Sequence, residues 1–126
     1  MQHPQHARSL ALYAQCERKS SACAAHSLAE TYATLTRLPG KFRMSCDHAL
    51  LFLEDVRKRS TIIALESEEY FSALTSAVEA DLAGGRIYDR LIAACALKWG
   101  ADNIYTWNIA DFQRLGPEIS HRVRTP

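Results

Sequence analysis

The chain has 126 residues, 48% of them hydrophobic and 23% charged, with a formal net charge of +1. These values are ordinary for one globular domain and argue against disorder, collagen or a coiled coil for the chain as a whole. No apolar run approaches the roughly 20 residues of a membrane-spanning helix, and the polar N-terminal segment is unlike a secretory signal. We therefore expect a cytoplasmic protein without membrane contact.

Charge is unevenly distributed along the chain. Residues 61–85 contain five Asp or Glu and no Lys or Arg, whereas the segments on either side are basic. An acidic helix face exposed to solvent is the simplest interpretation of that segment.

Four cysteines, Cys16, Cys23, Cys46 and Cys95, lack any C-x-x-C spacing. Without a sign of export, we expect reduced, mostly buried thiols and no disulfide framework. The gap between Cys23 and His26 suits a metal ligand pair, but a second pair is missing, so a structural zinc site is not expected.

Helices and strands are predicted to alternate. Ser45 suits the N-cap of a helix that ends near Arg57-Lys58-Arg59, and Gly100 suits the end of a nearly all-apolar, buried helix. Ser67 with Glu68 and Glu69 predicts a helix start. The predicted helices cover 4–19, 28–38, 46–59, 67–83, 87–98 and 110–115, and the predicted strands cover 22–25, 61–65, 103–107 and 118–123. Phe71, Leu74, Val78 and Leu82 are the expected apolar stripe of the helix that begins at Ser67.

This order predicts the α/β class, with a mostly parallel sheet and helices on both faces. Such folds usually begin with a strand, whereas this chain begins with a helix, as if one strand were absent from the front. We expect strands 22–25 and 103–107 to flank the position of that strand. Because bare apolar strand edges invite pairing, a dimer or higher assembly is expected.

Two carboxylates are the best candidates for chemistry, because no nucleophile motif, phosphate loop or dinucleotide fingerprint is present. Glu30 follows the first predicted strand, and Asp89 opens the nearly all-apolar helix. Taken singly, each has a plainer interpretation: Glu30 as an exposed helical side chain, and Asp89 as a partner of the helix dipole. Ligands of such folds bind at the carboxyl ends of strands, where Thr106 and Asn108 also lie. Converging oxygen ligands there would suit Mg²⁺ or Mn²⁺.

Three segments resemble the acidic motifs of PIN-domain proteins of the VapC toxin type. They are HSLAETYATLTRLP at 26–39, IYDRLIAA at 87–94 and IYTWNIADF at 104–112. The resemblance extends over nearly the whole chain, with the three segments in the expected order and spacing. The resemblance implies an α/β/α sandwich that cleaves RNA phosphodiester bonds with Mg²⁺ or Mn²⁺. It also implies a cognate antitoxin protein, a homodimer and a single PIN-like domain over residues 1–126.

By position, the resemblance makes Glu30 and Asp89 metal ligands and makes Asn108 a further catalytic residue. Thr106 and Asp111 would support the corner around Asn108. The family's first strand and its Asp-x-Asn-type motif have no counterpart here, so we expect the domain to be N-terminally incomplete and its activity impaired. A catalytically idle PIN-like module that binds an antitoxin or RNA is the alternative, and a small flavodoxin-like ligand binder is a weaker one.

Basic side chains near these motifs are candidates for RNA contact, because contacts to phosphate favour Lys and Arg. The candidates are Arg37, Lys41, Arg43 and Arg90. For each of them taken singly, an ordinary solvated surface residue is the alternative.

Overall fold

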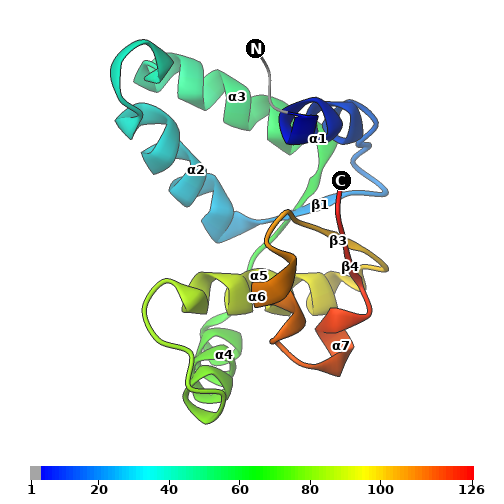
Figure 1. Cartoon of the computed structure of the whole chain (residues 1–126). Helices are drawn as coiled ribbons and strands as arrows, with labels where there is room; N and C mark the ends of the chain where they lie inside the picture. Colours follow the sequence, from blue (N-terminus) through cyan, green and yellow to red (C-terminus); the bar gives the residue numbers. More distant parts are fainter. Residues whose placement is uncertain (1–3) are drawn as a thin grey trace. The chain divides into compact units, whose positions relative to one another are not determined.

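The computed structural model describes residues 4–126, and the first three residues of the polar N-terminal segment lie outside the described part. The chain divides into two compact units (Figure 1). The middle unit comprises Glu17–Ala64, and the C-terminal unit comprises Leu65–Pro126 together with Met1–Cys16. Each unit contains helices and one pair of parallel strands, which confirms the α/β class.

The middle unit is built around two strands and two long helices. Its elements are β1 (Ala22–Ala24), α2 (Ala25–Arg37), the 3₁₀ turn η1 (Gly40–Phe42), α3 (Cys46–Arg59) and β2 (Thr61–Ile63). Strand β1 pairs with β2 in parallel, with Cys23 opposite Ile62. Thr61 extends this pairing, since its N–H donates to the Ser21 carbonyl at 2.8 Å and its hydroxyl to the Arg18 carbonyl at 2.6 Å.

Ser45 begins α3 as predicted. Its hydroxyl accepts the backbone N–H of His48 at 3.2 Å, which satisfies one of the donors that a helix start leaves without a partner. Arg57, Lys58 and Arg59 lie in the last turn of the helix, where cations favour the helix dipole.

The C-terminal unit contains five helices and the second strand pair among the described residues. Its elements are α1 (Pro4–Ala14), α4 (Ser67–Glu79), α5 (Arg86–Trp99), β3 (Ile104–Tyr105), α6 (Ile109–Gln113), α7 (Pro117–Ser120) and β4 (Val123–Arg124). Strand β3 pairs with β4 in parallel, with Ile104 opposite Val123. Gly100 ends α5 in the left-handed conformation, at φ +81°, as the sequence predicts.

A buried apolar cluster gathers α5, α6, α7, β3 and β4. Its members are Ala93, Ile104, Phe112, Leu115, Ile119 and Val123. Burying a side chain such as Ile119 or Phe112 stabilises a fold by roughly 1.5–3 kcal/mol. This cluster therefore fixes α5 and α6, the two helices that carry Asp89, Arg90 and Asp111.

Helix α4 buries a different face from the one that the sequence predicts. Phe71 is 70% exposed and Val78 is 80% exposed, whereas Ala73 and Ala77 are buried. The two alanines stand four residues apart, so they share one face, and their small size allows the close approach of α5. The longer apolar side chains form the opposite face, so the predicted apolar stripe is not the buried one.

Several boundaries also differ from the prediction. Helix α1 ends at Ala14, because Gln15 and Cys16 donate their backbone N–H groups three residues back and residues 17–21 offer no apolar side chain to bury. Helix α4 begins at Ser67 as predicted, after a reciprocal capping box formed by the side chains of Glu66 and Glu69, but it ends at Glu79 and not near residue 83. The strand predicted over 118–123 is instead α7 followed by β4, because Pro117 suits the first turn of a helix.

Candidate active site

Asp89 occupies the first turn of α5, as the sequence predicts, and is half-buried. The turn begins after Gly84 and Gly85, which leave room for the chain to reverse from α4 into α5. A carboxylate in this turn is stabilised by the positive end of the helix dipole. The fold thus places one carboxylate, whose oxygen atoms are candidate metal ligands, at the start of the most buried helix.

The corner around Asn108 connects β3 to α6. The Thr106 hydroxyl accepts the backbone N–H of Asn108 at 3.0 Å, which holds the connection in a tight turn. Asn108 is exposed and precedes α6, and Asp111 lies in the first turn of that helix. The Trp107 indole N–H donates to the Ser9 hydroxyl at 2.8 Å and so fastens the corner to α1.

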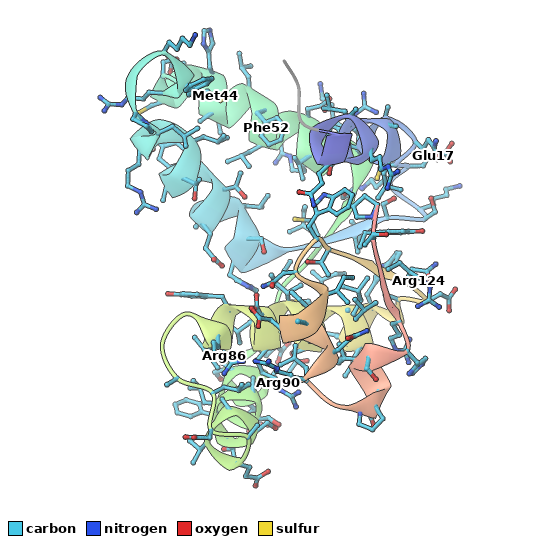
Figure 2. The ribbon with its side chains drawn as sticks, in the orientation of Figure 1. Glu17, Met44, Phe52, Arg86, Arg90 and Arg124 are labelled. Carbon is cyan, nitrogen blue, oxygen red and sulfur yellow. The ribbon has the colours of Figure 1, made fainter. Side chains whose placement is uncertain are left out.

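Arg86 connects the start of α5 with α6. Its Nη2 lies 3.9 Å from Asp111 Oδ1, and both side chains are about two-fifths exposed. Arg86, labelled in Figure 2, shares the first turn of α5 with Asp89, and Asp111 lies in the first turn of α6, which contacts α5. An exposed ion pair of this length contributes little stability. Its effect is to position Asp111.

Arg90 has a structural contact of its own. Its Nη1 donates to the Leu115 carbonyl at 3.0 Å, and the side chain is half-buried. It lines two neighbouring clefts of about 240 Å³ and about 290 Å³. Arg90 therefore differs from the other predicted RNA-binding residues, which are exposed.

Arg37, Lys41 and Arg43 lie at the connection between α2 and α3 in the middle unit, and all three are exposed. Lys41 Nζ stands 5.5 Å from the centre of the Phe42 ring, within cation–π distance. Arg43 Nε donates to the Leu38 carbonyl at 3.0 Å. Nearby, a hydrogen bond with Cys46 raises the pKa of Tyr32.

Glu30 belongs to the middle unit and lies in the second turn of α2. Its Oε1 is buried and has no hydrogen-bond partner. His26 Nε2, one turn earlier, lies 3.5 Å away and is likewise buried without a hydrogen-bond partner. The sequence singled out Glu30 but not His26, although the i, i+4 spacing places both side chains on one face of a helix.

The four cysteines follow the prediction in part. All four cysteines carry thiols and not disulfides, with Cys95 buried and Cys16 and Cys23 half-buried, but Cys46 is exposed. Burial raises the pKa of the Cys23 thiol, which keeps it protonated and slow to react.

The donor set can be tested for its fit to a divalent ion. Glu30 Oε1 is a carboxylate oxygen that is shielded from solvent, has no hydrogen-bond partner and stands at ion-pair distance, 3.5 Å, from His26 Nε2. Asp89, Asn108 and Asp111 supply further oxygen atoms, which hard divalent cations prefer. Within residues 4–126, no three His, Cys, Asp or Glu side chains are grouped closely enough to hold an ion. The residue types suit a divalent ion, but Glu30 belongs to the middle unit and Asp89, Asn108 and Asp111 belong to the C-terminal unit, so each unit contributes its oxygen atoms separately.

Comparison with known proteins identifies the family. The chain is 31% identical over 100 residues to ribonuclease VapC27 of Mycobacterium tuberculosis, an alignment that covers 79% of this chain and 69% of that protein. It is 35% identical over 77 residues to ribonuclease VapC40 of the same organism, covering 61% of this chain and 57% of that protein. No family model and no solved structure matches the chain.

The chain therefore belongs to the VapC-type PIN-domain proteins, the ribonuclease toxins of toxin–antitoxin pairs. This confirms the resemblance found in the three acidic segments. Members of this family use a divalent metal ion. Among the helices of the described residues, none has the length and apolarity to cross a membrane.

Proposed function

We propose that the chain is a metal-dependent endoribonuclease that cleaves RNA phosphodiester bonds and acts as the toxin of a toxin–antitoxin pair. The observation that carries this proposal is the similarity to ribonuclease VapC27 over 79% of the chain. The aligned proteins extend beyond the matched region, so activity, substrate and partners are proposed for this chain from its own residues.

The proposed catalytic residues are Glu30, Asp89 and Asn108. Glu30 and Asp89 hold a divalent ion, which supplies the charge that polarises the phosphate and activates the attacking water. Asn108, exposed before α6, directs its side-chain amide to the substrate, and the bond from its N–H to Thr106 holds it in place. Asp111 supports the same corner through its contact with Arg86.

RNA is proposed to contact Arg37, Lys41 and Arg43, which are exposed on the connection between α2 and α3. Lys41 and Arg43 are partly ordered by their contacts with Phe42 and the Leu38 carbonyl, which lowers the entropy lost on binding. Arg90 is the fourth proposed contact. Its Nη1 donates to the Leu115 carbonyl, so the other guanidinium nitrogens are the ones proposed to contact phosphate. Each phosphate contact makes binding more sensitive to salt.

The finer features of the family are proposed for this chain as well. The ion is Mg²⁺ or Mn²⁺, the partners are an antitoxin and a second copy of the chain, and the setting is the cytoplasm. Residues 1–126 act as a single PIN-like domain. The exposed apolar side chains of α4, above all Phe71 and Val78, support association with protein, because large apolar side chains gain free energy when they leave water.

Cleavage of a structured RNA by the purified chain with Mn²⁺ tests the proposal. We expect the Asp89→Asn variant to lose at least about 100-fold in rate, because the amide cannot supply the anionic ligand. Asp102→Asn is the matched control, since Asp102 is an exposed carboxylate of the same unit with no proposed role. Equal rates for the wild type and the Asp89→Asn variant would contradict the catalytic assignment. An inactive wild-type chain that still binds RNA would favour the idle binding module.

A further inference from the structure

The connection between α2 and α3 presents an aromatic ring to solvent. Phe42, the last residue of η1, is 67% exposed, although leaving water would lower the free energy of such a side chain. Single exposed apolar side chains are common in folded proteins, so exposure alone assigns no role to the ring. The charges around it do.

The chain around Phe42 is uniformly basic. Residues 31–46 include three cations and no carboxylate, and the three cations are Arg37, Lys41 and Arg43. All three are exposed, and Lys41 Nζ lies 5.5 Å from the centre of the Phe42 ring. Proteins that bind single-stranded nucleic acids combine the same two features, because bases stack on aromatic rings while phosphates contact the cations nearby.

Backbone hydrogen bonds hold this connection in place. The N–H of Met44, which Figure 2 labels, donates to the Leu35 carbonyl at 3.0 Å and closes the connection onto the last turn of α2. Gly40 takes the left-handed conformation, at φ +58°, and its carbonyl accepts the Arg43 N–H at 3.3 Å. Because the turn that bears Phe42 is already ordered, less conformational entropy is lost when a ligand binds to it.

Phe71 of α4 shows that exposure and charge are separate properties. It is 70% exposed, but it lies in the segment 61–85, which has five Asp or Glu and no Lys or Arg. Phosphates are repelled by such a segment, whereas the cations beside Phe42 attract them. Of these two similarly exposed rings, only that of Phe42 suits an anionic ligand with a flat apolar face.

We propose that Phe42 stacks on an unpaired base of RNA, a contact that fully paired RNA cannot make. The proposal rests on the proposed function for the class of ligand, and it adds a residue and a requirement for an unpaired nucleotide. A base inside a duplex is stacked on its neighbours, whereas a base in a loop or single strand can be turned out to meet an aromatic ring. Every base has such a face, so the contact selects the strandedness of the RNA and not its sequence.

Fluorescence anisotropy of a labelled single-stranded oligoadenylate of about 10 nucleotides tests this inference. The full chain is used without divalent ions, so that the RNA stays intact. We expect Phe42→Leu, which keeps an apolar side chain but removes the ring, to weaken binding at least about 5-fold through the loss of one stacked base. Phe42→Tyr restores a ring and is expected to bind within about 2-fold of the wild type. Affinity for a duplex of oligoadenylate with oligouridylate should change far less.

Two controls separate stacking from other effects. Leu51→Ala should leave the affinity unchanged, since Leu51 is 65% exposed on α3 of the same unit and has no proposed role. Phe42→Leu should keep the wild-type slope of log affinity against log salt, whereas Lys41→Gln should reduce its magnitude by about 0.7, the value of one phosphate contact to a single strand. Exposed substitutions rarely disturb folding, and circular dichroism checks each variant.

Several results would overturn the inference. They are equal oligoadenylate affinities for the wild type and Phe42→Leu, equal losses in Phe42→Leu and Phe42→Tyr, an equal loss for the duplex, or no binding of oligoadenylate by the wild type. If the wild type cleaves RNA and Asp89→Asn does not, while Phe42→Leu binds oligoadenylate normally, the inference fails and the proposed function stands. If binding depends on the ring but RNA stays intact with Mn²⁺, the stacking contact stands and the ribonuclease proposal fails.

Discussion

The two units differ in how their apolar side chains are used. The C-terminal unit joins Ile104, Phe112, Leu115 and Ile119 into one buried cluster, whereas among the described residues of the middle unit only Ala24, Ala49 and Ser60 are buried. The middle unit does not lack apolar residues, since Leu50, Leu51 and Phe52 all lie on α3 and are exposed. Figure 2 labels Phe52 among them. Consecutive residues point about 100° apart around a helix, so no single neighbouring surface covers all three. Position on the helix, more than composition, decides which unit has a core.

Truncating one apolar side chain in each unit is the strongest test of this difference between the two cores. Ile119→Ala should lower the free energy of unfolding by about 2–5 kcal/mol, because Ile119 is only 1% exposed and its removal leaves a cavity. Leu51→Ala should change it by less than about 0.5 kcal/mol, since Leu51 is 65% exposed. Urea unfolding followed by circular dichroism measures both. Similar losses for the two variants would show that the middle unit has a core of its own under those conditions.

Helix caps offer a second, smaller contrast between the units. Ser45→Ala should cost about 1 kcal/mol, because it removes the acceptor for the His48 N–H at the start of α3. Ser67→Ala at the start of α4 is the matched control and should cost less than about 0.5 kcal/mol, because Glu66 and Glu69 cap that helix instead. The same unfolding measurement applies. A larger loss at Ser67 than at Ser45 would contradict the assignment of the caps.

Ion pairs give the smallest expected effect. In the middle unit the pairs Glu54–Arg57 and Asp55–Arg59 lie within α3, whereas Glu69 of α4 accepts from Lys98 of α5 at 2.7 Å in the C-terminal unit. The hydrogen bond from Lys98 and that from the Glu66 backbone lower the pKa of Glu69 below its ordinary value of 4.5, and the bond to Glu69 raises the pKa of Lys98.

A lowered carboxylate pKa stabilises the fold at pH values above 4.5, and this contribution is lost as the pH falls through the pKa of the folded state. The melting temperature of the wild type should therefore fall on acidification below that pH, and Glu69→Gln should flatten this part of the profile. Added salt should reduce the difference, because the pair is exposed. Identical acid profiles for the two proteins would show that the Glu69–Lys98 ion pair contributes nothing to stability.

Local signals predicted much of this architecture. Ser45 and Gly100 act at single positions through backbone chemistry, so their neighbours in sequence suffice to predict them. The prediction of which face of α4 is buried was wrong. Hydrophobicity favoured the face of Phe71 and Val78, whereas the close packing of two helices buries the face of the small Ala73 and Ala77. Of the candidate site, Glu30 and Asp89 stay predictions, made from the place of Glu30 after a strand and of Asp89 at a helix start. The contact of His26 with Glu30 was not predicted, because five histidines stand in unrelated contexts and only the folded chain shows the two side chains 3.5 Å apart.

Trp107, whose indole donates to Ser9, also has an optical consequence. The two tryptophans of the chain, Trp99 and Trp107, both belong to the C-terminal unit, and the middle unit has none. Tryptophan fluorescence, excited at a wavelength where tyrosine absorbs little, therefore reports the unfolding of the C-terminal unit alone. The far-ultraviolet circular dichroism of the helices reports the unfolding of both units. Superposition of the two signals during denaturation would mean that the units melt as one cooperative body, and a gap between them would assign each transition to its own unit.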